Sequence, residues 1–113
     1  MAELFIKGLI VHLFVDWFLQ PDWMSENKTK LGHPAAWVHG ILNTLGNLLV
    51  FSWPIALGLG LSHMLLDTRT PLNWWRQLLH QNPQGEHGRL FRVLQDQAAH
   101  LILIGLAAFL ASQ

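Results

Sequence analysis

The sequence of 113 residues contains no cysteine and no tyrosine, and only 12% of its residues are charged. Without cysteine the chain forms no disulfide and offers no thiolate ligand or cysteine nucleophile, so a metal ion would have to bind nitrogen and oxygen atoms. Seven basic and seven acidic residues give a formal net charge of zero. Because no basic stripe is present to neutralise a phosphate backbone, we expect no nucleic-acid partner.

Charged residues are missing altogether from residues 31–66. A soluble domain of this size covers most of its surface with polar groups, so the sequence predicts an all-α integral membrane bundle in a single domain, 1–113. A soluble four-helix bundle with an unusually apolar surface is the alternative. Prolines and polar clusters separate four expected transmembrane helices, and a short interfacial amphipathic helix is expected at 71–81. The expected spans are 3–20, 34–53, 54–68 and 89–111.

The basic residues predict an orientation. Six of the seven flank the expected helices on one side, which the positive-inside tendency makes cytoplasmic: Lys28, Lys30, Arg69, Arg76, Arg89 and Arg92. Both termini are then expected on the non-cytoplasmic side of a multi-pass protein.

Polar side chains recur at four-residue steps within the apolar segments. The pairs are His12 with Asp16, His63 with Asp67, and Asp96 with His100, and the second segment carries His39. Residues four apart share one face of a helix. An aspartate inside a membrane helix costs about 2.5–3.5 kcal/mol, so three of them require compensation by protonated histidine or by a metal ion.

These residue types predict a metal site. Four imidazoles and three carboxylates suit one or two divalent ions of the Zn, Mn or Fe type, with Mg less favoured because it prefers oxygen. The candidate ligands are His12, Asp16, His39, His63, Asp67, Asp96 and His100, and the catalytic candidates are Asp16, His39, Asp67 and Asp96. A purely structural network of hydrogen-bonded His and Asp residues remains open.

The predicted function is that of a membrane-embedded metal-dependent hydrolase. A divalent ion activates water and polarises a phosphoryl or carbonyl oxygen. A site at the cytoplasmic leaflet of the lipid bilayer favours an amphiphilic substrate, such as a lipid or an isoprenoid phosphate. Two other functions stay open: a structural or pigment- or haem-binding small subunit of a larger membrane complex, and a metal or proton transport element. The expected partners therefore include a homo-oligomer or such a complex.

The ordered motifs resemble a known family. The motif HxxxDxxxQxDW, the segments SHMLLD (62–67) and DQAAH (96–100), and the intervening His39 resemble the small bacterial membrane family catalogued as domain of unknown function 3307. The first motif is filled by His12, Asp16, Gln20, Asp22 and Trp23. The resemblance covers nearly the whole chain and implies a compact multi-span protein of bacteria or their phages, hence the bacterial inner membrane. It implies no established activity, but it draws attention to Asn27 and Lys28 in the following loop.

Overall fold

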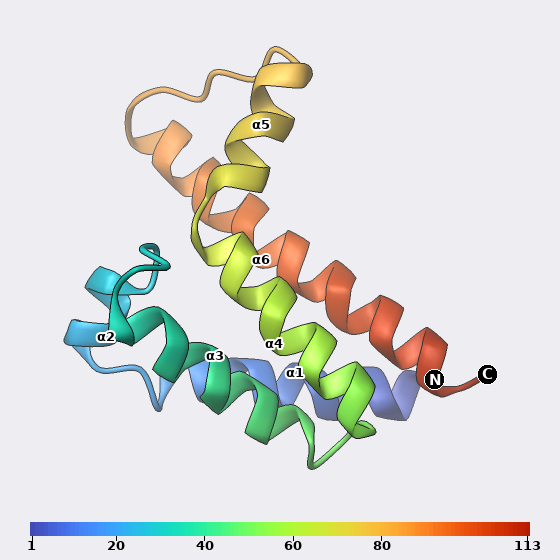
Figure 1. The fold of residues 1–113 in the computed structure, drawn as a ribbon. Coiled ribbons are helices and arrows are strands. Elements are labelled where there is room, and N and C mark those ends of the chain that lie inside the picture. The colour runs from blue at the N-terminus through green and yellow to red at the C-terminus, as the bar shows by residue number, and fades with distance from the viewer.

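The computed structural model describes residues 1–113, which form six helices and no strand (Figure 1). The radius of gyration, 14.2 Å, is close to the roughly 13 Å of a compact domain of 100 residues. The helices are α1 (Ala2–Trp17), α2 (Asp22–Asn27), α3 (Pro34–Asn47), α4 (Trp53–Asp67), α5 (Thr70–Leu78) and α6 (Gly85–Ala111).

The predicted bundle of four transmembrane helices is wrong, because only α6 is long and apolar enough to cross a membrane. Helices α1, α3 and α4 contain 16, 14 and 15 residues, whereas a membrane span needs about 20. The core helix of a soluble protein passes the same test of length and composition as α6. The predicted orientation, with both termini non-cytoplasmic, depended on four spans and loses its basis.

The four-span prediction fails because an apolar segment forms a turn where a continuous helix was expected. The expected second span, 34–53, ends as a helix at Asn47, and residues 48–52 reverse the chain before α4 begins at Trp53. Pro54 lies in the first turn of α4, where its missing N–H leaves no hydrogen bond unmade. Residues 48–51 are as apolar as the helices on either side, so hydropathy does not reveal the break.

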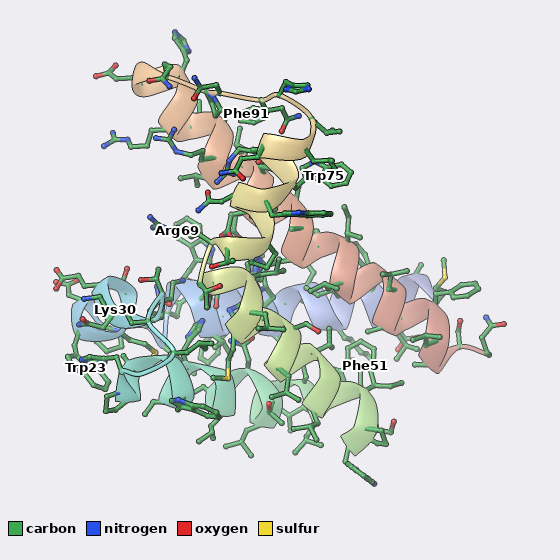
Figure 2. All side chains as sticks on the ribbon, turned by 45° about the horizontal axis from the view of Figure 1, so that its top comes forward. Trp23, Lys30, Phe51, Arg69, Trp75 and Phe91 are labelled. Atoms are coloured by element: carbon green, nitrogen blue, oxygen red, sulfur yellow. The ribbon has the colours of Figure 1, made fainter.

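Two shorter helices also differ from expectation. Helix α2 was not predicted, whereas α5 overlaps the expected amphipathic helix at 71–81. The only buried residue of α5 is Arg76, while Trp75 and Leu78 are exposed. Figure 2 shows Trp75 projecting away from the helices. Helix α5 therefore contacts the rest of the protein through its cationic residue and presents apolar side chains outward.

The long helices cross around a centre rich in polar groups. Leu4 and Phe5 of α1 pack against Ala107 and Ala108 of α6, so the two helices run in opposite directions and both termini lie at one end of the molecule (Figure 1). Only ten hydrophobic residues are buried, compared with nine polar or charged ones, and 32 large hydrophobic side chains are exposed. The usual distribution of polar and apolar residues is thus largely reversed.

Close packing of α3 on α4 depends on Gly60, which yields a stability prediction. A Cβ at Gly60 would overlap the hydroxyl of Thr44, which donates a 3.0 Å hydrogen bond to the Gly40 carbonyl oxygen. We expect Gly60→Ala to lower the free energy of unfolding by about 1–3 kcal/mol. Gly58→Ala is the matched control, because nothing lies within 4 Å of its added Cβ, and alanine should stabilise that helix by up to about 1 kcal/mol. Equal effects in chemical unfolding would contradict this packing role.

Candidate functional site

The structure brings all seven candidate residues to the centre of the molecule. They come from α1 (His12, Asp16), α3 (His39), α4 (His63, Asp67) and α6 (Asp96, His100). The pairs at four-residue steps face inward together: His63 Nε2 lies 3.1 Å from Asp67 Oδ2, and His12 Nε2 lies 3.6 Å from Asp16 Oδ2. All except Asp96 are buried, and the Asp96 side chain is 28% exposed.

Four of these side chains lie in mutual contact through their imidazole nitrogens, and we call them the His/Asp tetrad: Asp16, His39, His63 and Asp67. His39 Nε2 lies 2.8 Å from His63 Nε2 and 3.0 Å from Asp16 Oδ1. The other three nitrogen–oxygen distances are 3.1, 3.4 and 3.4 Å. A tetrahedral ion with bonds of 2.0–2.1 Å holds its ligand atoms about 3.3–3.4 Å apart. The five distances lie near this spacing, and His39, His63 and Asp67 form a group able to hold a metal ion, with Asp16 Oδ1 3.0 and 3.4 Å from its two imidazole nitrogens.

The carboxylate oxygens of the tetrad lack hydrogen-bond donors. Asp16 Oδ1 and Asp67 Oδ2 are buried without a partner of hydrogen-bonding geometry, although imidazole nitrogens lie 3.0–3.4 Å away. Buried acceptors are nearly always satisfied, because leaving one bare costs about 1–3 kcal/mol or more when it is charged. Two converging carboxylate oxygens and two converging imidazoles are what a cation would satisfy.

A second group adjoins the tetrad through Asp67. Nδ1 of His100 donates a 2.7 Å hydrogen bond to the Asp96 carbonyl oxygen, because a carbonyl can only accept. In the neutral imidazole, Nε2 therefore carries a lone pair, which lies 3.5 Å from Asp67 Oδ1 and has no hydrogen-bond partner. Asp67, Asp96 and His100 together could hold a metal ion. Asp67 thus faces the tetrad with one oxygen and this group with the other.

His12 occupies a different position from the other candidate ligands. Its Nε2 lies 3.2 Å from Gln97 Oε1 and 3.6 Å from Asp16 Oδ2. Since the amide oxygen is an acceptor, the N–H of His12 donates to Gln97 Oε1, and the contact with Asp16 is electrostatic. The His12 ring also stacks on that of His100, with centroids 5.2 Å apart. With Asp16 and His63, His12 forms a further group able to hold a metal ion once its Nε2 is free of that proton.

The candidate residues omit three nearby polar side chains. Gln97 contacts His12, and Lys28 places Nζ 3.9 Å from Asp67 Oδ1. Gln97 follows Asp96 directly and belongs to no four-residue pair, so the sequence does not mark it. The resemblance had drawn attention to Lys28. Asn43 stands one turn from His39 and places Nδ2 3.3 Å from the His39 carbonyl oxygen.

Burial and the neighbouring charges shift the pKa values of the side chains in the cluster. Burial alone would raise the pKa of Asp16 and Asp67, but the imidazoles of His39, His63 and His100 beside them and the positive charge on His63 hold both pKa values well below the usual range. Burial would likewise lower the pKa of His63, yet the two carboxylates raise it to about 9. Near neutral pH the cluster therefore holds two ionised carboxylates, as a metal site requires.

A cleft connects the cluster to the surface. Its volume is about 400 Å³, and its walls are formed by α1, α2, α4, α6 and the segments that follow α2 and α4. Asp16, Asp67 and Asp96 line it, together with Lys28 and Arg69. His39 and His63 do not line this cleft and lie behind the carboxylates. A small molecule could thus approach the three aspartates while the imidazoles remain enclosed.

Comparison with known proteins places the chain in a family but not in a functional class. The family described as protein of unknown function (DUF3307) matches residues 4–113. No curated protein and no solved structure matches the chain.

Proposed function

The chain belongs to the DUF3307 family of proteins of unknown function, and from its His/Asp cluster we propose that it is a metal-dependent hydrolase. The observation that carries the proposal is the convergence of two imidazole nitrogens and two unsatisfied carboxylate oxygens at 2.8–3.4 Å. A mixed nitrogen and oxygen donor set suits Zn, Mn or Fe better than Mg. The group of Asp67, Asp96 and His100 supports a second ion of the same type.

The residues of the proposed metal site have three different roles. Asp16, His39, His63 and Asp67 would hold the ion, which supplies water activation and polarises a scissile carbonyl or phosphoryl group when bound. His12 orients Asp16 through a contact to its second oxygen. Asp96 is half-buried, lines the cleft and lies 3.8 Å from His100 Nδ1. With a single ion bound at the tetrad, Asp96 is therefore the group best placed to take a proton from an attacking water and pass it to a leaving group.

His39 differs from the other catalytic candidates. It is only 1% exposed, and its Nε2 contacts other members of the tetrad instead of the cleft. A general base must come within hydrogen-bond reach of the proton that it abstracts. We therefore assign His39 to holding the ion rather than to proton transfer.

The apolar exterior supports an amphiphilic substrate at a lipid surface. The 32 exposed large hydrophobic side chains exceed what a monomeric soluble protein usually leaves in water. The exposed Trp74, Trp75 and Leu78 of α5 add aromatic and aliphatic groups of the kind that favours a bilayer interface. We propose that the protein associates with the bacterial inner membrane and that its substrate carries an apolar tail, as a lipid or an isoprenoid derivative does.

Metal content and metal-dependent hydrolysis test this function. Protein purified in detergent without chelator should contain one or two equivalents of Zn, Mn or Fe by elemental analysis. It should cleave p-nitrophenyl butyrate or p-nitrophenyl phosphate. Removing the metal with EDTA should lower the rate at least about 100-fold, and adding back the same metal should restore it. Absence of transition metal before and after reconstitution would overturn the proposal and leave the cluster as a structural network.

A further inference from the structure

A second cleft, next to the first, gathers all four arginines of the chain. Its volume is about 340 Å³, and Arg69, Arg76, Arg89 and Arg92 line it with a single carboxylate, Asp96. They come from three parts of the fold: the link between α4 and α5, α5 itself and the first half of α6. Arg69 stands at the junction of α4 and α5 (Figure 2). We call this the arginine cleft.

None of these guanidinium groups is paired with a carboxylate. Every ion pair in the structure involves lysine or histidine as its cation. Arg76 is 92% buried, and its hydrogen bonds go to the neutral side chains of Gln95 and Asn73. Arg92 donates a 2.9 Å hydrogen bond to the Pro83 carbonyl oxygen. A buried guanidinium is costly without a counter-charge, so an anion bound in this cleft would stabilise Arg76.

The backbone around Arg69 supports the same conclusion. Arg69 has φ +66°, in the left-handed region that side chains other than glycine rarely adopt. This conformation changes the direction of the chain after α4, so that α5 leaves α4 at an angle and Arg76 reaches Gln95 of α6. Strained residues of this kind cluster at ligand sites. Here the turn also places Arg69 on the walls of both clefts.

We propose that the arginine cleft binds the phosphoryl group of the substrate. The planar fork of arginine matches phosphate oxygens, and four arginines against one aspartate suit a group with more than one negative charge. The two clefts share Arg69, Val93 and Asp96, so a phosphate held by Arg89 and Arg92 lies next to the carboxylates of the proposed metal site. This inference rests on the proposed function for its catalytic meaning and narrows the substrate to phosphate esters.

Binding of inorganic phosphate to metal-free protein tests the cleft separately from hydrolysis. After EDTA treatment the aspartates repel phosphate, so calorimetric titration with orthophosphate reports on the arginines alone. Arg89→Gln and Arg92→Gln should each raise Kd about tenfold or more, the change expected for one charge-assisted hydrogen bond. Both residues are exposed, and circular dichroism would verify folding. Lys7→Gln is the control, since it removes one positive charge from an exposed pair with Glu3 outside both clefts.

A parallel titration with octyl phosphate shows whether the bound phosphoryl group belongs to an amphiphilic ester or to a small soluble one. Tighter binding than orthophosphate would support an amphiphilic phosphate ester, and equal binding would support a small soluble one. Absence of phosphate binding, or equal Kd values in the wild type and both arginine variants, would overturn the inference even if p-nitrophenyl butyrate is hydrolysed. Arginine-dependent phosphate binding without any hydrolysis would uphold it and overturn only the proposed function.

Discussion

Replacing Asp67 with Asn is expected to abolish stoichiometric metal binding and hydrolysis. Oδ2 of Asp67 contacts both imidazoles of the tetrad, and Oδ1 faces His100 and Lys28. The amide would retain the volume of the side chain but would remove one negative charge and direct a donor at nitrogen atoms that need their lone pairs for metal. Metal affinity should fall by more than the roughly 10- to 100-fold caused by losing an outer contact of a metal ligand. Competition with a chromogenic chelator would measure it.

The control for this change is Asp22→Asn. Asp22 is the one aspartate outside the cluster and is exposed at the start of α2, so the same substitution should leave metal content and rate unchanged. Retention of full metal content in Asp67→Asn would contradict the assignment of Asp67 as a ligand. If neither the wild type nor Asp67→Asn binds metal, and Asp67→Asn loses several kcal/mol of stability, the cluster is a structural network. The substitution has then left a buried charge without its partner.

The second large effect is a loss of stability of the metal-free protein at alkaline pH. The pKa of His63 is raised to about 9 in the folded protein, whereas an unfolded histidine has a pKa of about 6.5. The stabilisation from protonated His63 is therefore complete below about pH 6.5 and is lost as the pH rises toward 9. At 1.36 kcal/mol per pKa unit the loss is on the order of 3 kcal/mol. Urea unfolding of EDTA-treated protein at several pH values would measure it.

The carboxylates act in the opposite pH range. Because the pKa values of Asp16 and Asp67 are lowered on folding, their contribution is present above about pH 4 and is lost as the pH falls below it. The stability of the metal-free protein should therefore reach its maximum between about pH 4 and 6.5.

Bound metal should remove the loss of stability at alkaline pH, because the His63 nitrogen that ligates the metal is already deprotonated. With saturating metal, the free energy of unfolding should stay level or rise between pH 6.5 and 9. His63→Gln should abolish the alkaline loss of stability of the metal-free protein, whereas His87→Gln, at an exposed position, should retain it. The same downward slope with and without metal would show that His63 is not a ligand.

The four-residue steps determined which side chains share a face. This result depends only on the pitch of a helix, so the pairs His12 with Asp16 and His63 with Asp67 meet wherever their helices pack. The low charge likewise predicted an apolar exterior, which the 32 exposed large hydrophobic side chains display.

Tertiary structure decided the lengths of the helices and the identity of each contact. Residues 48–51 of the turn are as apolar as the helices beside it, so hydropathy did not reveal the turn or the failure of the four-span prediction. The burial of Arg76 against Gln95, the contact of Gln97 with His12, and the two directions in which Asp67 points all arise between helices. Such contacts depend on how helices cross, which hydrophobic periodicity does not encode.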